Sequence, residues 1–83
     1  MAARLTAHQA AALEVIDRYQ REQGFPPTRR ELAGFMGWTA PSSAQRMIDV
    51  LISKGVIERV AARHGVIRVT DTGAEALQER QAA

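Results

Sequence analysis

The fold of this chain is decided between residues 26 and 41, which read PPTRRELAGFMGWTAP. Two prolines keep the chain extended, and Thr28, followed three residues later by a glutamate, forms the capping-box pattern that starts a helix. Gly37 suits the left-handed position that ends a helix. Pro41 suits the first turn of another helix, because its missing N–H would have no partner there. The stretch therefore predicts two helices joined by a short turn, the second over about residues 41–54.

The sequence before this stretch predicts one more helix. Thr6 and Gln9 form a second capping-box pair, and apolar residues follow at helical spacing as far as Tyr19. Gly24 then ends this helix shortly before the two prolines. The first two thirds of the chain are therefore expected to hold three helices, each with its own start or stop signal.

The sequence after the third helix changes to β-branched residues. Residues 56–60 and 66–69 predict the two strands of a β-hairpin with a basic turn between them. A short last helix is expected over about residues 71–81, started by Thr70 or Asp71. Its expected apolar face is thin and consists of Ala74, Ala76 and Leu77.

This order of elements predicts a mainly α fold with a small β-hairpin, namely a three-helix winged helix-turn-helix followed by a short C-terminal helix. We expect one domain over residues 1–83, with its core in residues 5–69. Trp38 is expected to fill the core beside the turn, and a stacking function for its ring is the less favoured alternative. Helical spacing assigns core positions on the second and third helices to Leu32, Phe35, Met36, Ala44, Met47, Ile48, Leu51 and Ile52.

The composition argues against several classes of protein. With 83 residues the chain is expected to hold no second, catalytic domain, and with no cysteine it forms neither disulfides nor a thiolate zinc site. No apolar run approaches the ~20 residues that span a bilayer, so a soluble, cytoplasmic protein without membrane contact is expected. His8 and His64 are far apart without a companion carboxylate cluster, so no metal or other cofactor is expected. Ser42 and Ser43 have no base in a recognised catalytic arrangement, which argues against an enzyme with a small-molecule substrate.

The net charge of +2 is unevenly distributed along the chain. Residues 28–68 carry seven basic and three acidic side chains, whereas residues 1–27 are neutral overall and residues 69–83 have a charge of −2. Attraction of phosphate requires such a local concentration of positive charge, and a merely solvated surface explains the charge alone equally well.

The polar side of the helix predicted over residues 41–54 is the candidate reading face. A major groove admits one helix, and the N-terminal half of such a helix reaches base edges. The residues expected to contact bases are Ser42, Ser43, Gln45 and Arg46. The residues expected to contact the DNA backbone are Thr28, Arg29, Arg30, Lys54, Arg59, Arg63 and His64. Simple exposure to solvent is the alternative for the arginines that start the second helix and for the residues at the hairpin tip.

Several short strings in this chain occur together in one known family. They are Leu5-Thr6, Gly24-Phe25-Pro26-Pro27-Thr28-Arg29, Glu31-Leu32-Ala33, Met36-Gly37-Trp38, Ala40-Pro41, Lys54-Gly55-Val56-Ile57-Glu58 and Ile67-Arg68. Over about residues 5–69 they resemble the N-terminal DNA-binding domain of the LexA family, the repressors of the SOS response. The match is specific because caps, turn glycines, prolines and a strand agree together. The resemblance implies a three-helix winged helix-turn-helix that reads operator DNA with its third helix.

The chain departs from this family in two respects. LexA proteins continue into a self-cleaving, dimerising domain with an Ala-Gly cleavage site and a Ser-Lys dyad; here Ala33-Gly34 falls inside a predicted helix, so regulation by self-cleavage is not expected. The family's Ser-Pro-Asn-Ala-Ala-Glu-Glu corresponds here to Ala40-Pro41-Ser42-Ser43-Ala44-Gln45-Arg46. The equivalent positions imply that the third helix docks as in the family, and the different side chains imply that it reads different bases. Gln45 is suited to adenine and Arg46 to guanine. The serine of that family motif, the expected N-cap, is an alanine here, and Thr39 is the neighbour that can replace it.

Two functions of different classes fit these observations. The first is a sequence-specific, repressor-like transcription regulator of a bacterium or phage. It would bind double-stranded DNA as a homodimer, on tandem sites or with a partner protein, because one module contacts few bases. The alternative is a winged-helix module that contacts another protein and modulates a larger repressor or enzyme. Asp49 on the outer side of the third helix and the acidic C-terminal segment favour this alternative. DNA binding predicts an affinity that falls steeply with salt, whereas a protein interface depends on apolar patches.

Overall fold

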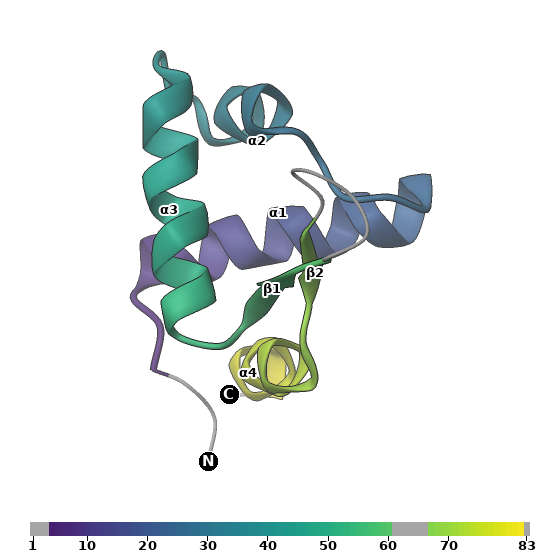
Figure 1. Cartoon of the computed structure of the whole chain (residues 1–83). Coiled ribbons are helices and arrows are strands. Elements are labelled where there is room, and N and C mark those ends of the chain that lie inside the picture. Colours follow the sequence, from purple (N-terminus) through teal and green to yellow (C-terminus); the bar gives the residue numbers. More distant parts are fainter. Residues whose placement is uncertain (1–3, 61–66, 83) are drawn as a thin grey trace.

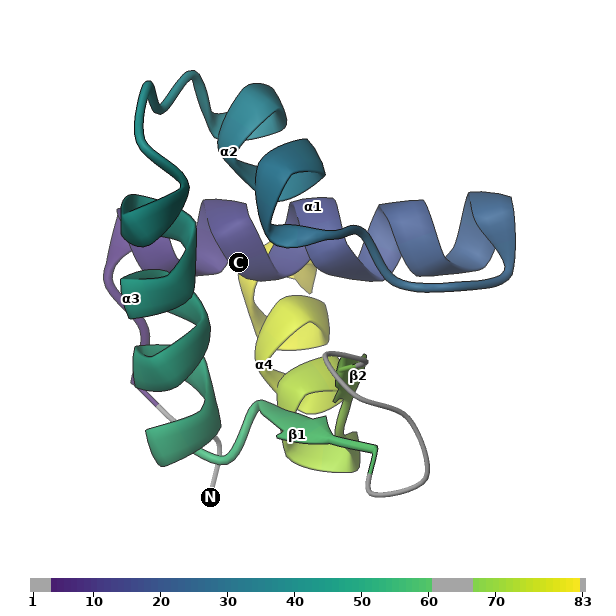
Figure 2. The same cartoon turned by 45° about the horizontal axis from the view of Figure 1, so that its top comes forward.

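The first helix, α1 (Ala7–Gln23), packs against the other three helices and the second strand of the hairpin. The computed structural model describes residues 4–60 and 67–82. In that part of the chain the remaining elements are α2 (Arg29–Met36), α3 (Pro41–Ser53), β1 (Ile57–Arg59), β2 (Ile67–Val69) and α4 (Asp71–Ala82). α3 crosses one end of α1, α2 lies on one side of α1, and the hairpin and α4 lie on the other side (Figures 1 and 2). This arrangement confirms the predicted, mainly helical fold with one hairpin.

Both predicted capping boxes form. The Oγ1 atoms of Thr6 and Thr28 each accept from the backbone N–H three residues later, at 3.1 Å. In return the side chains of Gln9 and Glu31 accept from the threonine N–H groups at 3.0 and 2.9 Å. Each box pairs two N–H groups, one of them an orphan donor of the helix start, so α1 and α2 begin where the sequence predicts.

Two glycines with positive φ end α2 and α3. Gly37 has φ 74° and Gly55 has φ 76°, which places both in the left-handed region. The N–H group after each glycine bonds back into the helix, from Trp38 to Ala33 O at 2.8 Å and from Val56 to Leu51 O at 3.2 Å. This bonding pairs carbonyl groups that a helix end would leave free. α3 therefore ends at Ser53, one residue earlier than predicted, because its last turn closes onto the glycine.

The start of α3 has no side-chain cap. Ala40 occupies the N-cap position with extended φ −115° and ψ 129°, and its carbonyl oxygen accepts from Ser43 N at 3.1 Å. The idea that Thr39 replaces the missing serine is wrong, because the residue in N-cap geometry is Ala40 and no side chain bonds to the helix start. α3 begins through Pro41 in its first turn and through the packing of its apolar side.

β1 is shorter than predicted at both ends, and the predicted start of the other strand, Val66, lies outside the described residues. β1 and β2 pair antiparallel over three residues each, with Glu58 opposite Arg68 and an ion pair between those two side chains. Val56 lies outside β1 because its N–H group is bonded to the end of α3. The predicted turn, including Arg63 and His64, lies outside the described residues.

The core lies between α1, α2, α3 and the hairpin. The buried residues that pack together are Ala12, Leu13, Ile16, Leu32, Ala33, Ala44, Ile48, Leu51, Val56, Ile57, Ile67 and Leu77. Met36, Trp38, Met47 and Ile52 are partly buried and pack against this cluster. The prediction that Phe35 faces the core is wrong: its side chain is 59% exposed, because α2 turns Leu32, Ala33 and Met36 inward and Phe35 away.

α4 docks through a glycine. A Cβ at Gly73 would overlap the carbonyl oxygen of Val56 and lie 2.9 Å from Val69 Cγ1, so only glycine permits this approach. Thr70 starts the helix, since its Oγ1 accepts from Gly73 N at 3.1 Å and donates to Gly55 O at 2.6 Å. Within residues 71–80 of α4 the buried residues are Gly73, Ala76 and Leu77. The predicted inward position of Ala74 is wrong, because Ala74 is exposed beside this stripe.

Candidate nucleic-acid interface

The outward side of α3 carries the four residues predicted to contact bases. Its opposite side is apolar and buried, through Ala44, Ile48 and Leu51. Ser42 and Arg46 are exposed, and Ser43 and Gln45 are partly exposed. α3 is thus fixed by its apolar stripe, and its polar stripe faces solvent along the helix. Neither serine hydroxyl is bonded to a histidine or a carboxylate among the described residues, 4–60 and 67–82.

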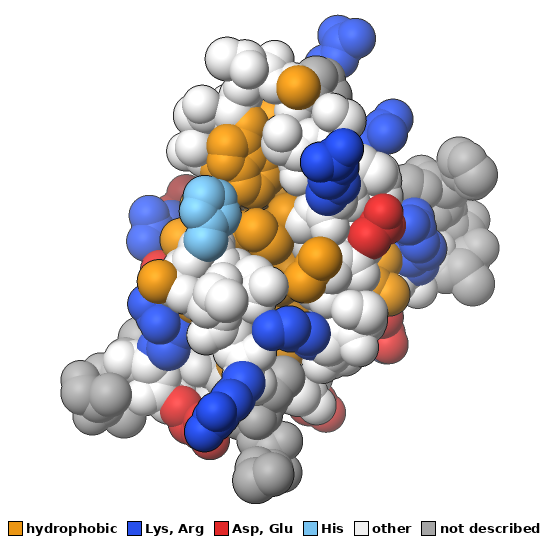
Figure 3. Space-filling view, turned by 90° about the vertical axis from the view of Figure 1, so that its left-hand side faces the viewer, with side chains coloured by type: hydrophobic (Ala, Val, Ile, Leu, Met, Phe, Trp, Pro, Cys, Tyr) orange, Lys and Arg blue, Asp and Glu red, His pale blue; other side chains and the backbone are white. Residues whose placement is uncertain are grey.

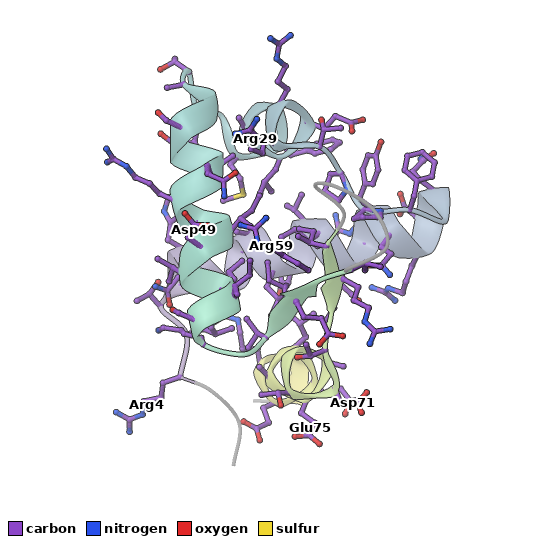
Figure 4. All side chains as sticks on the ribbon, viewed as in Figure 1. Arg4, Arg29, Asp49, Arg59, Asp71 and Glu75 are labelled. Atoms are coloured by element: carbon purple, nitrogen blue, oxygen red, sulfur yellow. The ribbon has the colours of Figure 1, made fainter. Side chains whose placement is uncertain are left out.

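A chain of polar contacts crosses this surface from α2 to β1. Gln45 Oε1 accepts from Arg29 Nη1 at 3.4 Å, and Gln45 Nε2 donates to Asp49 Oδ1 at 2.8 Å. Arg59 Nη2 lies 3.4 Å from the same Asp49 oxygen. Arg29, Asp49 and Arg59 lie on one side of the molecule, over the angle between α2, α3 and the hairpin (Figure 4). The structure therefore brings together three of the predicted DNA-contacting residues.

The remaining predicted cations have different surroundings. Arg30 is exposed in the first turn of α2. The Lys54 ammonium instead donates to Arg4 O at 2.7 Å and to Gln9 Oε1 at 2.8 Å, which ties the end of α3 to the start of α1. In the space-filling view of the side that carries α3, Lys and Arg side chains are spread over the surface with hydrophobic side chains between them (Figure 3).

Thr28 and Glu31 hold the start of α2 in place. The Thr28 hydroxyl is used by the capping box, and Glu31 Oε2 accepts from the Tyr19 hydroxyl of α1 at 2.5 Å. This bond, followed by the backbone bond from Thr28, lowers the pKa of the Glu31 carboxyl. The same bond raises the pKa of the Tyr19 hydroxyl. The sequence indicated the capping box and missed the bond to Tyr19, which depends on how α1 and α2 pack.

Trp38 is covered by a histidine. The rings of His8 and Trp38 are parallel within 4° and their centroids are 5.5 Å apart, while Trp38 also packs against the core. The predicted core role of Trp38 is thus only partly confirmed, because the ring is half-buried at the junction of α1 and the turn. The sequence shows only that His8 lies in the first turn of a helix, which does not predict the stack on Trp38.

The acidic residues of the C-terminal segment lie away from this surface. Asp71 and Glu75 are exposed on α4, at the end of the molecule opposite α2 (Figure 4). Within residues 4–60 and 67–82, no three His, Cys, Asp or Glu side chains are placed to share a metal ion. No helix in the same ranges is long and apolar enough to cross a membrane.

Comparison with known proteins identifies a family. Residues 2–65 match the family described as the LexA DNA binding domain. The LexA repressor of Polaromonas naphthalenivorans (strain CJ2) is 40% identical over 76 residues, which cover 92% of this chain and 32% of that protein. The LexA repressor of Marinobacter nauticus (strain ATCC 700491 / DSM 11845 / VT8) is 38% identical over 68 residues, which cover 82% of this chain and 34% of that protein.

The chain spans about a third of the length of the curated relatives that it matches. The matched region contains α1, α2, α3 and β1, and the architecture is that of a winged helix-turn-helix with an additional C-terminal helix. The resemblance noted in the sequence is therefore confirmed by an independent match over most of the chain. The chain belongs to the LexA DNA-binding domain family.

Proposed function

We propose that this domain binds double-stranded DNA sequence-specifically, with α3 in the major groove, and acts in transcriptional repression. The observation that carries the proposal is the outward side of α3, which is polar along its length and flanked by arginines of α2 and β1. In this fold, the helix that enters a groove packs its apolar side on the core and presents its polar side to solvent. Membership of the LexA DNA-binding domain family supports the same use of the surface.

The proposal gives different roles to the two groups of predicted residues. Ser42, Ser43, Gln45 and Arg46 face base edges, where Gln45 suits adenine and Arg46 suits guanine. Arg29 and Arg30 lie in the first turn of α2, where the helix dipole adds to their attraction for a phosphate. Arg59 contacts the backbone from β1. Thr28 and Lys54 remain predicted backbone contacts, and Lys54 also ties the end of α3 to the start of α1. Arg63 and His64 remain predicted backbone contacts of the hairpin tip.

The experiment is a selection of the preferred duplex from random DNA, followed by binding at several salt concentrations. We expect selective binding that weakens with salt, and a salt slope that falls by about 0.9 in Arg29→Ala because one phosphate contact is lost. Arg80→Ala is the matched control, since Arg80 is an exposed arginine on α4, which packs on α1 and β2. Weak binding to every duplex, or equal effects of the two substitutions, would contradict the proposal.

Gln45→Ala tests the reading of bases. Truncation of a side chain that contacts a base should relax the preference at one base pair and cost about 1–3 kcal/mol on the preferred duplex. Binding to scrambled DNA should stay unchanged, because Gln45 carries no charge. A uniform loss on all duplexes would indicate damage to α3 rather than a lost base contact, and thermal unfolding of the variant separates the two.

A second candidate function, self-association of the chain, is favoured by an aromatic cluster at the end of α1. Phe25 and Phe35 are 55% and 59% exposed, and both rings meet Tyr19 edge to face at centroid distances of 5.8 and 5.7 Å. Large exposed aromatic side chains commonly mark contact surfaces. The occupant that we propose is a second copy of the chain, because operator sites are usually bound by two such modules.

Sedimentation of wild type and of Phe25→Ser/Phe35→Ser tests this candidate. We expect wild type to dimerise at the highest soluble concentration and the double variant to stay monomeric with its fold intact, since both rings are largely exposed. The double variant should keep its affinity for a single half-site. A wild type that stays monomeric both alone and on a duplex with two half-sites would refute the candidate and leave DNA binding unaffected.

A further inference from the structure

Asp49 is an acidic residue on a surface that is otherwise proposed to face phosphates. Its side chain is 57% exposed and lies on the outward side of α3, towards the hairpin (Figure 4). A carboxylate close to DNA is repelled by the phosphates, so its charge weakens binding to every duplex. Asp49 can still contribute indirectly, by holding neighbouring side chains that face the DNA in the proposed complex.

Two of these neighbours bond to the same oxygen of Asp49. Gln45 Nε2 donates to Asp49 Oδ1 at 2.8 Å, and Arg59 Nη2 donates to it at 3.4 Å. At its other end the amide oxygen of Gln45 accepts from Arg29 Nη1 at 3.4 Å. The Gln45 amide is thus held between a carboxylate of its own helix and a guanidinium of α2.

The chemistry of these partners fixes which way the Gln45 amide points. A carboxylate only accepts hydrogen bonds and a guanidinium only donates them, so the NH2 group faces Asp49 and the oxygen faces Arg29. An amide turned by half a rotation would set oxygen against carboxylate and NH2 against guanidinium. In the observed orientation Oε1 keeps one lone pair and Nε2 keeps one N–H. These are the acceptor and the donor that pair with N6 and N7 of adenine.

We infer that Asp49 is a specificity-determining residue, which positions the Gln45 amide for one base edge and acts through Gln45. The inference rests on the proposed function, because it requires α3 to lie in the major groove. A side chain that is already held loses less rotational freedom on binding, so orientation by Asp49 favours the matched base pair over the others. The preference at the base pair that Gln45 contacts then depends on Asp49, which does not touch that base pair.

Two substitutions at Asp49 separate positioning from charge. In Asp49→Asn the side-chain oxygen still accepts from Gln45, whereas Asp49→Ala removes the acceptor, and both remove the charge. Binding is measured on duplexes that differ only at the base pair identified by Gln45→Ala. We expect Asp49→Ala to lower discrimination at that pair by about tenfold or more, and Asp49→Asn to retain it. Both should bind scrambled DNA more tightly than wild type, by similar factors.

Undiminished discrimination in Asp49→Ala would overturn the inference. An equal loss in Asp49→Asn and Asp49→Ala would also overturn it, because the effect would then belong to the charge. The double variant Gln45→Ala/Asp49→Ala should discriminate as Gln45→Ala does, and a further loss would mean that Asp49 reads DNA itself. If wild type selects no duplex, the proposed function fails. If wild type selects a duplex and Asp49→Ala discriminates equally well, only the inference about Asp49 fails. Thermal unfolding checks that each variant is folded.

Discussion

At the scale of single residues, Glu31 joins two helices through its two carboxylate oxygens. Oε1 accepts from Thr28 N and completes the cap of α2, and Oε2 accepts from the Tyr19 hydroxyl of α1. The bond to Tyr19 is the largest cause of the lowered pKa of Glu31, and the backbone bond to Thr28 is the next. Glu31 therefore ties the start of α2 to α1.

The lowered pKa of Glu31 predicts a pH dependence of stability. A carboxyl whose pKa is lower in the folded state stabilises folding above its ordinary pKa, 4.5, and loses this contribution as the pH falls through the folded value. Tyr19→Phe removes the largest cause. We therefore expect the free-energy difference between wild type and Tyr19→Phe, measured by urea unfolding, to be smaller at about pH 3 than at about pH 7. An equal difference at both pH values would assign the effect to packing of the Tyr19 ring.

The uncapped start of α3 predicts a stabilising substitution. Ala40 has the extended backbone of an N-cap, so Ala40→Ser should add the missing bond to a free N–H group and raise the free energy of unfolding by about 1 kcal/mol. Thr39→Ala should change it little, because Thr39 does not occupy the cap. A thermal melt of both variants tests this pair. A large loss in Thr39→Ala would contradict the assignment of the cap to Ala40.

At the scale of elements, the attachment of α4 depends on close approach to the hairpin. Gly73 lies against the Val56 carbonyl and Val69, and Thr70 bonds to Gly55 O at 2.6 Å. Gly34 in α2 provides the comparison, because a Cβ added at this helical glycine would meet no atom within 4 Å. The two glycines look alike in the sequence, and only the neighbouring elements distinguish them.

Alanine at these two glycines should therefore act in opposite directions. Gly73→Ala forces α4 away from the hairpin and should lower the free energy of unfolding by about 1–3 kcal/mol. Gly34→Ala should raise it by up to about 1 kcal/mol, because alanine favours a helix at an unobstructed position. Chemical unfolding measures both. Equal effects would mean that α4 is not docked as described.

At the scale of the whole molecule, one cluster of apolar side chains joins the elements of the described structure. Leu13 and Ile16 of α1, Leu32 of α2, Leu51 of α3 and Ile57 of β1 are all fully buried or nearly so. A domain of this size is stabilised by about 4–12 kcal/mol in total, on the order of 0.1 kcal/mol per residue. A single cavity in this cluster is therefore large compared with the total.

Leu51→Ala should lower the free energy of unfolding by about 2–5 kcal/mol, because the fully buried side chain leaves a cavity between the elements. Leu5→Ala, the same change at a partly buried residue packed at the edge of the cluster, should cost less. Circular dichroism during urea unfolding gives both values. A Leu51→Ala variant as stable as Leu5→Ala would mean that α3 is held by other contacts.

The caps and the faces of most elements follow from the sequence, because these features are local. Thr6, Thr28 and Gly37 act on groups within a few residues of themselves, so their patterns predict the starts and the turn without knowledge of the rest. The polar stripe of α3 follows in the same way from helical spacing. The family was recognisable for this reason, since its caps, turns and strand follow one another along the chain.

Contacts between residues of different elements depend on how the elements pack in three dimensions. The exposure of Phe35, the close fit at Gly73 and the bond from Tyr19 to Glu31 all depend on the angle and distance between helices. The same holds for the chain of contacts from Arg29 through Gln45 and Asp49 to Arg59, whose ends are thirty positions apart in the sequence. Periodicity fixes the side of a helix on which a residue lies, and only packing fixes what that side faces.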